Sequence, residues 1–187
     1  MATIQRSSSG TSSSTALDGD RLRHAAAWLF TAAVLFHNSD HVRRGADAVA
    51  SDVFWAGSLS ILLEVGVVAL VFLGHRVAPL FAATTGFSLA AGYVLVHLLP
   101  GRSWLSDPLF SGGGAEVVSQ LAASIEIVAA LSLGAAGLVA LRQRGGLTSA
   151  SSGGPSARTW SRALTHPAVL AMGVGNLVIL VLSLADR

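Results

Sequence analysis

A cluster of titratable side chains ends the first apolar segment of the chain. In the stretch FHNSDHVRRG, residues 36–45, His37, Asp40 and His41 occupy positions i, i+3 and i+4. On a helix they share one face, and Asp40 also comes within reach of Arg44. Histidines at i and i+4 can bind one metal ion, although HxxxH is a less specific pattern than HExxH. The alternatives are that the histidines cap the helix C-terminus near water and that Asp40 forms an exposed ion pair with Arg44.

Further ionisable groups stand inside later apolar segments, namely Glu64, His97 and Glu126. An ionisable side chain in the middle of a bilayer costs roughly 2.5–3.5 kcal/mol, so such groups rarely face lipid and usually mark a functional site. Tyr93 shares a helix face with His97 and adds a hydroxyl group. We therefore predict one intramembrane site. Its predicted cofactor-binding residues are His37, Glu64, Tyr93, His97 and Glu126, and its predicted metal ligands are His37, His41, Glu64 and His97.

The helical rise predicts how deep these groups lie. His37 is about one turn, roughly 5.4 Å, deeper in its segment than His41. We expect His37 to face the bundle centre, with Asp40 and Arg44 nearer water. Its expected neighbours there are Glu64, His97 and Glu126. Zinc suits such nitrogen and oxygen ligands best, and haem and quinone are the other candidate cofactors.

Other functions fit the same residues. A buried glutamate that is neutral and hydrogen-bonded to a nearby Ser or Tyr would serve only helix packing. Glu64 and Glu126 could instead relay protons in a small transporter. The chain contains no Gly-rich phosphate loop, no Ser-His-Asp order and no HExxH, so the sequence leaves open whether it is an enzyme or a structural protein without chemistry.

The composition is that of a membrane protein. Hydrophobic residues make up 52% of the 187-residue chain and charged residues only 12%, well below the charged content of a soluble domain. All twelve basic residues are arginines, scattered singly or in pairs, which argues against nucleic acid as a partner. There is no cysteine, which excludes disulfides and thiolate metal sites, so redox chemistry would need a cofactor.

Segment lengths predict an all-α integral membrane bundle. Each apolar segment is close to the roughly 20 residues that span a bilayer, and lipid leaves only helices as spanning segments. The expected spans are residues 22–42, 53–74, 77–99, 115–141 and 165–184. The expected organisation is a disordered tail over 1–20, a four-helix transmembrane bundle over 21–144, a flexible linker over 145–163 and a fifth transmembrane helix over 164–187.

The distribution of arginines predicts the orientation. With these spans, eight arginines lie on the N-terminal side of the membrane and four on the other. By the positive-inside rule the N-terminus is cytoplasmic. The use of Arg without Lys, with abundant Ala, Gly and Val, is typical of high-GC bacterial genes. We therefore expect a multi-pass protein of the bacterial plasma membrane, the inner membrane of the cell.

The chain also repeats itself loosely. The interval from His37 to Glu64 is 27 residues and that from His97 to Glu126 is 29, with a polar loop containing Ser-Asp in each. Two helical hairpins inserted in the same direction would be related by an axis along the membrane normal and would place two His and two Glu around one centre. Chance similarity between apolar helices is an equally good explanation.

Two stretches carry a family resemblance. The ending VLFHN of the first segment, followed by ILLEVGVVALVFLGHRVAPLFAATTGFSLAAGYVLVH, resembles the DoxX-like family of small four-helix bacterial membrane proteins over residues 25–141. The fifth helix and the polar NSDHVRRG depart from the family pattern. The resemblance implies association with membrane redox systems, since some members are subunits of a quinone-linked sulfur oxidoreductase. The expected partners of the chain are the lipid bilayer and either a membrane redox partner or a second copy of the chain.

Overall fold

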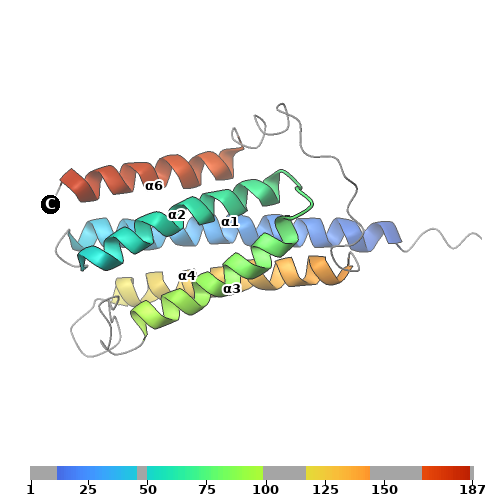
Figure 1. The fold of residues 1–187 in the computed structure, drawn as a ribbon, viewed down its shortest axis with the longest axis horizontal. Coiled ribbons are helices and arrows are strands. Elements are labelled where there is room, and N and C mark those ends of the chain that lie inside the picture. Colours follow the sequence, from blue (N-terminus) through green and yellow to red (C-terminus); the bar gives the residue numbers. More distant parts are fainter. Residues whose placement is uncertain (1–11, 46–49, 99–116, 144–165, 186–187) are drawn as a thin grey trace, which may run out of the picture.

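The computed structural model describes residues 12–45, 50–98, 117–143 and 166–185, and every regular element in that part of the chain is a helix. The helices run side by side along one direction (Figure 1). They are α1 (Ser12–Arg44), α2 (Ser51–Phe72), α3 (Ala78–His97), α4 (Val117–Gln143) and α6 (Pro167–Ala185). The prediction of an all-α fold is therefore confirmed for the described residues.

The predicted helix limits agree with the structure to within two residues, except at the start of α1. That helix begins at Ser12, so the expected disordered tail is wrong for residues 12–20. Extending an existing helix requires no new nucleation, which allows polar residues to continue it outward. Residues 1–11 and the expected linker over 145–163 lie outside the described residues.

The turn between α2 and α3 is fixed by glycine and proline. Gly74 has φ +60°, in the left-handed region that glycine adopts without strain. The amide of Gly74 donates to the carbonyl of Val71 at 3.0 Å, and that of His75 donates to the carbonyl of Leu70 at 3.1 Å, which together form a Schellman motif. Pro79 lies in the first turn of α3, where its missing N–H is tolerated. These residues bring α3 back antiparallel to α2.

Glycines allow α3 and α4 to approach backbone to backbone. A Cβ atom at Gly86 would lie 2.5 Å from the amide nitrogen of Gly134, and one at Gly137 would lie 2.5 Å from that of Ala83. Such distances leave no room for a side chain, as in the small-residue interfaces of membrane helices. This seam makes α3 and α4 the most extensive helix pair of the fold, and α4 also packs along α1.

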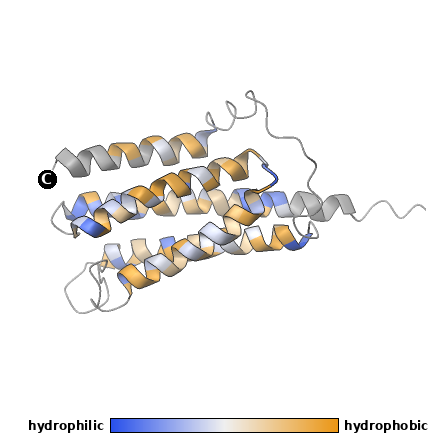
Figure 2. Cartoon of the chain, in the orientation of Figure 1, coloured by the Kyte–Doolittle hydropathy of each residue, from blue (hydrophilic) through white to orange (hydrophobic). Residues whose placement is uncertain are grey.

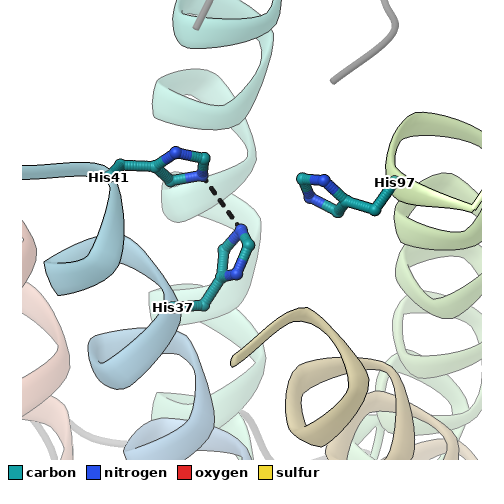
Figure 3. A group of neighbouring side chains, drawn as sticks. All are labelled: His37, His41 and His97. Carbon is teal, nitrogen blue, oxygen red and sulfur yellow. Dashed lines mark hydrogen bonds between the residues drawn. The ribbon is translucent and has the colours of Figure 1, made fainter. Parts of the chain in front are cut away.

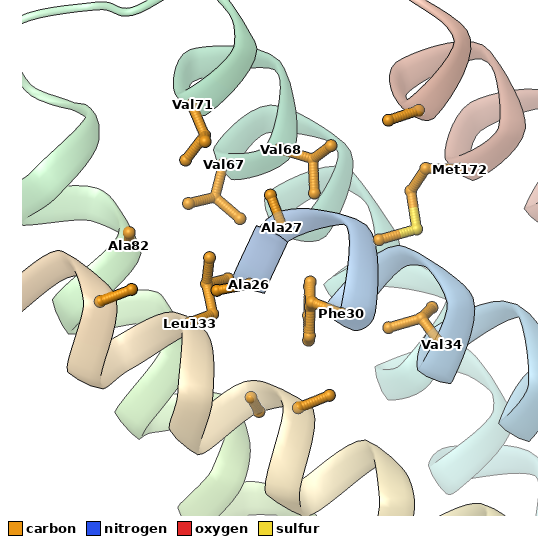
Figure 4. Packing of buried hydrophobic residues seen from close by; sticks show 14 of the residues in the cluster. Ala26, Ala27, Phe30, Val34, Val67, Val68, Val71, Ala82, Leu133 and Met172 are labelled. Carbon is orange, nitrogen blue, oxygen red and sulfur yellow. The ribbon is translucent and has the colours of Figure 1, made fainter. Parts of the chain in front are cut away.

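Helix α6 completes the core on the other side. It packs against α1 and α2, and Met172 is fully buried beside the buried Phe30 and Val34 of α1 (Figure 4). Val68 of α2 and Leu133 of α4 belong to the same hydrophobic cluster. The fifth helix is therefore part of the bundle.

Three helices are long and apolar enough to cross a membrane: Ser51–Phe72, Ala78–His97 and Val117–Gln143. The outward surface of α2 is strongly apolar, with Leu59, Leu62 and Leu63 between 62% and 71% exposed, and Figure 2 shows α2 largely orange and the hydrophilic residues gathered at the helix ends. An apolar surface of this kind needs lipid or protein to cover it. The findings indicate a multi-pass membrane protein.

The other two expected spans are not among these three. Helix α1 has polar residues within its apolar part, including Arg23, His24 and His37, which lower its mean hydropathy. Part of α6 lies outside the described side chains, so its role as a span stays a prediction. The expected orientation, with a cytoplasmic N-terminus, also stays a prediction.

Candidate metal centre

Three histidines meet at the end of the bundle where α1 and α3 terminate. His37 and His41 come from the last turns of α1, and His97 is the last residue of α3. Each ring offers one nitrogen, and these three nitrogens all lie within 4.8 Å of one another (Figure 3). We call His37, His41 and His97 the triad. His37 and His97 are each only 3% exposed, whereas His41 is half-buried.

The two triad histidines of α1 are in direct contact. The Nε2 atoms of His37 and His41 lie 3.0 Å apart, as the dashed line in Figure 3 marks. The ring centroids of His37 and His97 are 4.9 Å apart, so α1 and α3 bring their histidines face to edge. His37 and His97 are the equivalent residues of the predicted repeat, and the relation between the two hairpins stays a prediction.

Glu126 of α4 lies beside the triad. Its Oε2 atom is 3.5 Å from Nε2 of His37 and forms no hydrogen bond to any described residue. Glu126 is 2% exposed. A buried carboxylate without a full set of partners is costly, so a cationic neighbour would stabilise it. The prediction that His37 faces the bundle centre near a glutamate is confirmed for Glu126.

Glu64 lies in a hydrogen-bonded group of its own. Its Oε1 atom accepts hydrogen bonds of 2.9 Å from Ser60 and of 2.9 Å from Tyr93. The Tyr93 hydroxyl also lies near the carboxyl group of Glu126, so it stands close to both buried glutamates. Tyr93 thus contacts Glu64, whereas the sequence pattern had suggested His97 as its neighbour. The role of Glu64 as a metal ligand stays a prediction, because Glu64 is not among the three residues whose ligand atoms converge.

Two arginines surround Asp40 at the end of α1. The Oδ1 atom of Asp40 lies 2.8 Å from Nη2 of Arg43, and its Oδ2 atom lies 3.2 Å from Nε of Arg44. The expected pairing with Arg44 is confirmed. The expected exposure is wrong, because the side chain of Asp40 is only 1% exposed. Packing of α1 against α4 covers this face, and Arg43 reaches across to Ser119 of α4 at 3.2 Å.

Arg44 makes a contact that the sequence pattern did not single out. Its Nη2 atom lies 2.8 Å from Nδ1 of His41. The i, i+3 spacing of these two residues was available as a signal, but it suggested only the pair with Asp40. The contact of Arg43 with Ser119 joins two helices and therefore left no sequence signal.

The histidines at the opposite end of the bundle are arranged differently. The ring of Phe72 stacks on His24 with centroids 5.2 Å apart and on His166 with centroids 3.9 Å apart. Trp28 packs edge-on against Phe72. We call these four residues the aromatic stack. Burial lowers the pKa of His166, and the nearby His24 lowers that pKa further.

Comparison of the chain with protein-family models, with curated proteins and with solved structures finds no match. The resemblance to the DoxX-like family therefore remains an expectation from the sequence. The side chains at the triad end of the bundle are the residues that bear on function.

Proposed function

We propose that this protein is a metal-binding membrane protein whose triad holds one divalent transition-metal ion. The observation that carries the proposal is the convergence of three histidine nitrogens from two helices within 4.8 Å. Imidazole nitrogens suit zinc, copper, iron and nickel. Among these zinc is the first candidate, because it accepts nitrogen ligands without demanding a particular geometry.

The spacing of the triad supports this. Two nitrogens bound tetrahedrally at about 2.0–2.1 Å from zinc would lie about 3.3 Å apart. The Nε2 atoms of His37 and His41 are 3.0 Å apart, so small side-chain movements would admit an ion between them. Burial of His37 and His97 would keep that ion away from bulk water.

Three histidines leave one coordination position for another ligand, which is the pattern of catalytic zinc sites and not of structural ones. Glu126 lies beside His37 and can fill that position or accept a hydrogen bond from a water molecule held there. The geometry thus supports a site that exchanges a ligand. Such a site is compatible with a subunit of a membrane redox system, as the DoxX-like resemblance implies, and haem and quinone remain less direct alternatives. The plasma membrane of a bacterium is the proposed location.

Metal analysis of the full chain purified in detergent tests the proposal. We expect about one zinc ion per chain after incubation with zinc and washing. The protein loaded with Co²⁺ should show the visible absorption of a tetrahedral cobalt site, and His97→Ala should lose it. Absence of bound metal in the parent protein, or equal binding by His97→Ala, would refute the proposal.

A second candidate function is proton transfer. The Tyr93 hydroxyl donates to Glu64 and lies near Glu126, and buried carboxyl groups are frequent members of proton relays in membrane proteins. Proton flux into proteoliposomes tests this candidate. Glu64→Gln and Tyr93→Phe should both reduce the flux, with Ser88→Ala as a control on the same helix as Tyr93. Flux equal to the parent in both variants would remove the candidate.

A further inference from the structure

Arg44 donates a hydrogen bond to one of the proposed metal ligands. Its guanidinium nitrogen Nη2 lies 2.8 Å from Nδ1 of His41. A guanidinium group has five N–H donors and no acceptor, so Nδ1 of His41 must be the acceptor in this contact. Second-shell partners of metal-bound histidines are normally carboxylates, carbonyls or water, which accept a hydrogen bond. Arg44 is therefore the wrong kind of partner for a ligating histidine.

The contact blocks both ring nitrogens of His41. A neutral imidazole carries one N–H, so when Nδ1 accepts from Arg44 the hydrogen sits on Nε2, which faces His37 at 3.0 Å. A metal ion needs a lone pair on one of these nitrogens. The contact between Arg44 and His41 and the ligation of a metal by His41 thus exclude each other. In addition, the positive charge of Arg44 repels a cation at the triad.

A second position for Arg44 is close at hand. Its Nε atom lies 3.2 Å from Oδ2 of Asp40, yet neither of these two buried atoms forms a hydrogen bond to any described residue. A small rotation of the guanidinium away from His41 would convert this ion pair into a charge-assisted hydrogen bond. The side chain of Arg44 is 14% exposed, so it is not fully enclosed by protein.

We propose that Arg44 acts as a latch on the triad, and this inference rests on the proposed metal-binding function. When Arg44 donates to His41, His41 cannot serve as a metal ligand; when Arg44 turns to Asp40, it can. Metal binding is then coupled to the movement of Arg44, because each position of Arg44 favours a different state of His41. The latch lowers metal affinity and gives the site a way to release its ion.

A competition titration of the full chain in detergent, with zinc and a chromophoric chelator, tests the latch. Glutamine can accept a hydrogen bond from His41 and carries no charge, so Arg44→Gln should bind zinc about 10- to 100-fold more tightly than the parent. Damage to the fold would weaken binding, so a gain cannot arise from misfolding. Arg44→Met should give a gain in the same direction if relief of the contact is the cause.

Arg43→Gln is the matched control, because it removes the same charge from the adjacent residue, which contacts Asp40 and Ser119. Its zinc affinity should stay within about threefold of the parent value. An equal gain in zinc affinity by Arg43→Gln would show that the positive charge of either arginine, and not the contact with His41, lowers the affinity, and this would overturn the latch. Unchanged or weaker binding by Arg44→Gln would also overturn it, whereas a parent protein that binds no zinc would refute the proposed function itself.

Discussion

The two ends of the bundle both collect histidines but orient them differently. In the triad, ring nitrogens point at one another, with 3.0 Å between the Nε2 atoms of His37 and His41. In the aromatic stack, ring faces meet, since His24 and His166 lie nearly parallel to Phe72 at interplanar angles of 9° and 18°. Nitrogen edges that converge can bind an ion, whereas faces that stack serve packing.

The neighbours of the rings account for the difference. At the triad end the nearest helix contributes Glu126, a carboxylate that favours cations or hydrogen-bond donors. At the other end α2 contributes Phe72, whose ring face offers only apolar and aromatic contact. Histidine therefore offers ligand atoms at one end of the bundle and packs as an aromatic ring at the other. Substitutions at each end can test this difference.

The largest effect should come from removing a triad histidine. His37→Ala should weaken zinc binding by more than about 100-fold, because loss of an outer-shell partner alone costs 10- to 100-fold and His37 is a proposed ligand. His24→Ala should bind zinc as the parent does. A chelator competition titration compares the two variants. Equal losses in both would show that the two histidine groups do not differ in the way described.

Replacement of histidine by phenylalanine should affect the stability of the protein differently at the two ends of the bundle. At the triad, His37→Phe removes the nearest polar neighbour of the buried Glu126 carboxyl group and should lower the free energy of unfolding by about 1–3 kcal/mol. In the stack, His166→Phe keeps a ring against Phe72 and should change stability by no more than about 0.5 kcal/mol. Thermal unfolding in detergent measures both, and similar losses would contradict the comparison.

The two buried glutamates should differ in their effect on zinc binding by the triad. Glu126→Gln should weaken zinc binding about tenfold, because Glu126 adjoins His37 and supplies negative charge near the ion. Glu64→Gln should stay within about threefold of the parent, since Glu64 bonds to Ser60 and Tyr93. The same titration gives both values. If Glu64→Gln has the larger effect, Glu64 is the carboxylate of the metal site, as the sequence pattern predicts.

The smallest effect concerns pH at the aromatic stack. Because the pKa of His166 is lowered in the folded protein, the unfolded chain takes up a proton more readily. The contribution of His166 is therefore fully present above its unfolded pKa of about 6.5 and is lost as the pH falls through that value toward the folded pKa. Thermal unfolding at about pH 7.5 and about pH 5 should show a larger decrease for the parent than for His166→Phe. Equal decreases would exclude this role of His166.

The helices were predictable from sequence because hydropathy and length define them. Local spacing also predicted that His37 shares a face with His41 and that Asp40 comes within reach of Arg44, and both pairs lie close together. These relations depend only on the helical period, which is the same in every α-helix. Contacts within one helix are therefore predictable from its sequence.

Contacts between helices were less predictable. The sequence did not distinguish Glu126 from Glu64 as the neighbour of His37, because that depends on how α4 is rotated against α1. It placed Asp40 near water, whereas packing of α1 against α4 buries it. The burial of Met172 among residues of α1 depends on where α6 docks, which its own apolar pattern does not specify.

The close seam between α3 and α4 has a consequence for how this protein can vary. Gly86 and Gly137 lie in backbone contact with the neighbouring helix, and α4 also packs along α1, which carries two of the three histidines. A larger side chain in the seam would push α3 outward and carry His97 away from the other rings. Among natural relatives, these glycine positions should therefore accept almost no replacement, although they lie several helical turns from the triad. A relative with a larger residue at either glycine would lose the proposed metal binding, although its sequence would still contain all three histidines.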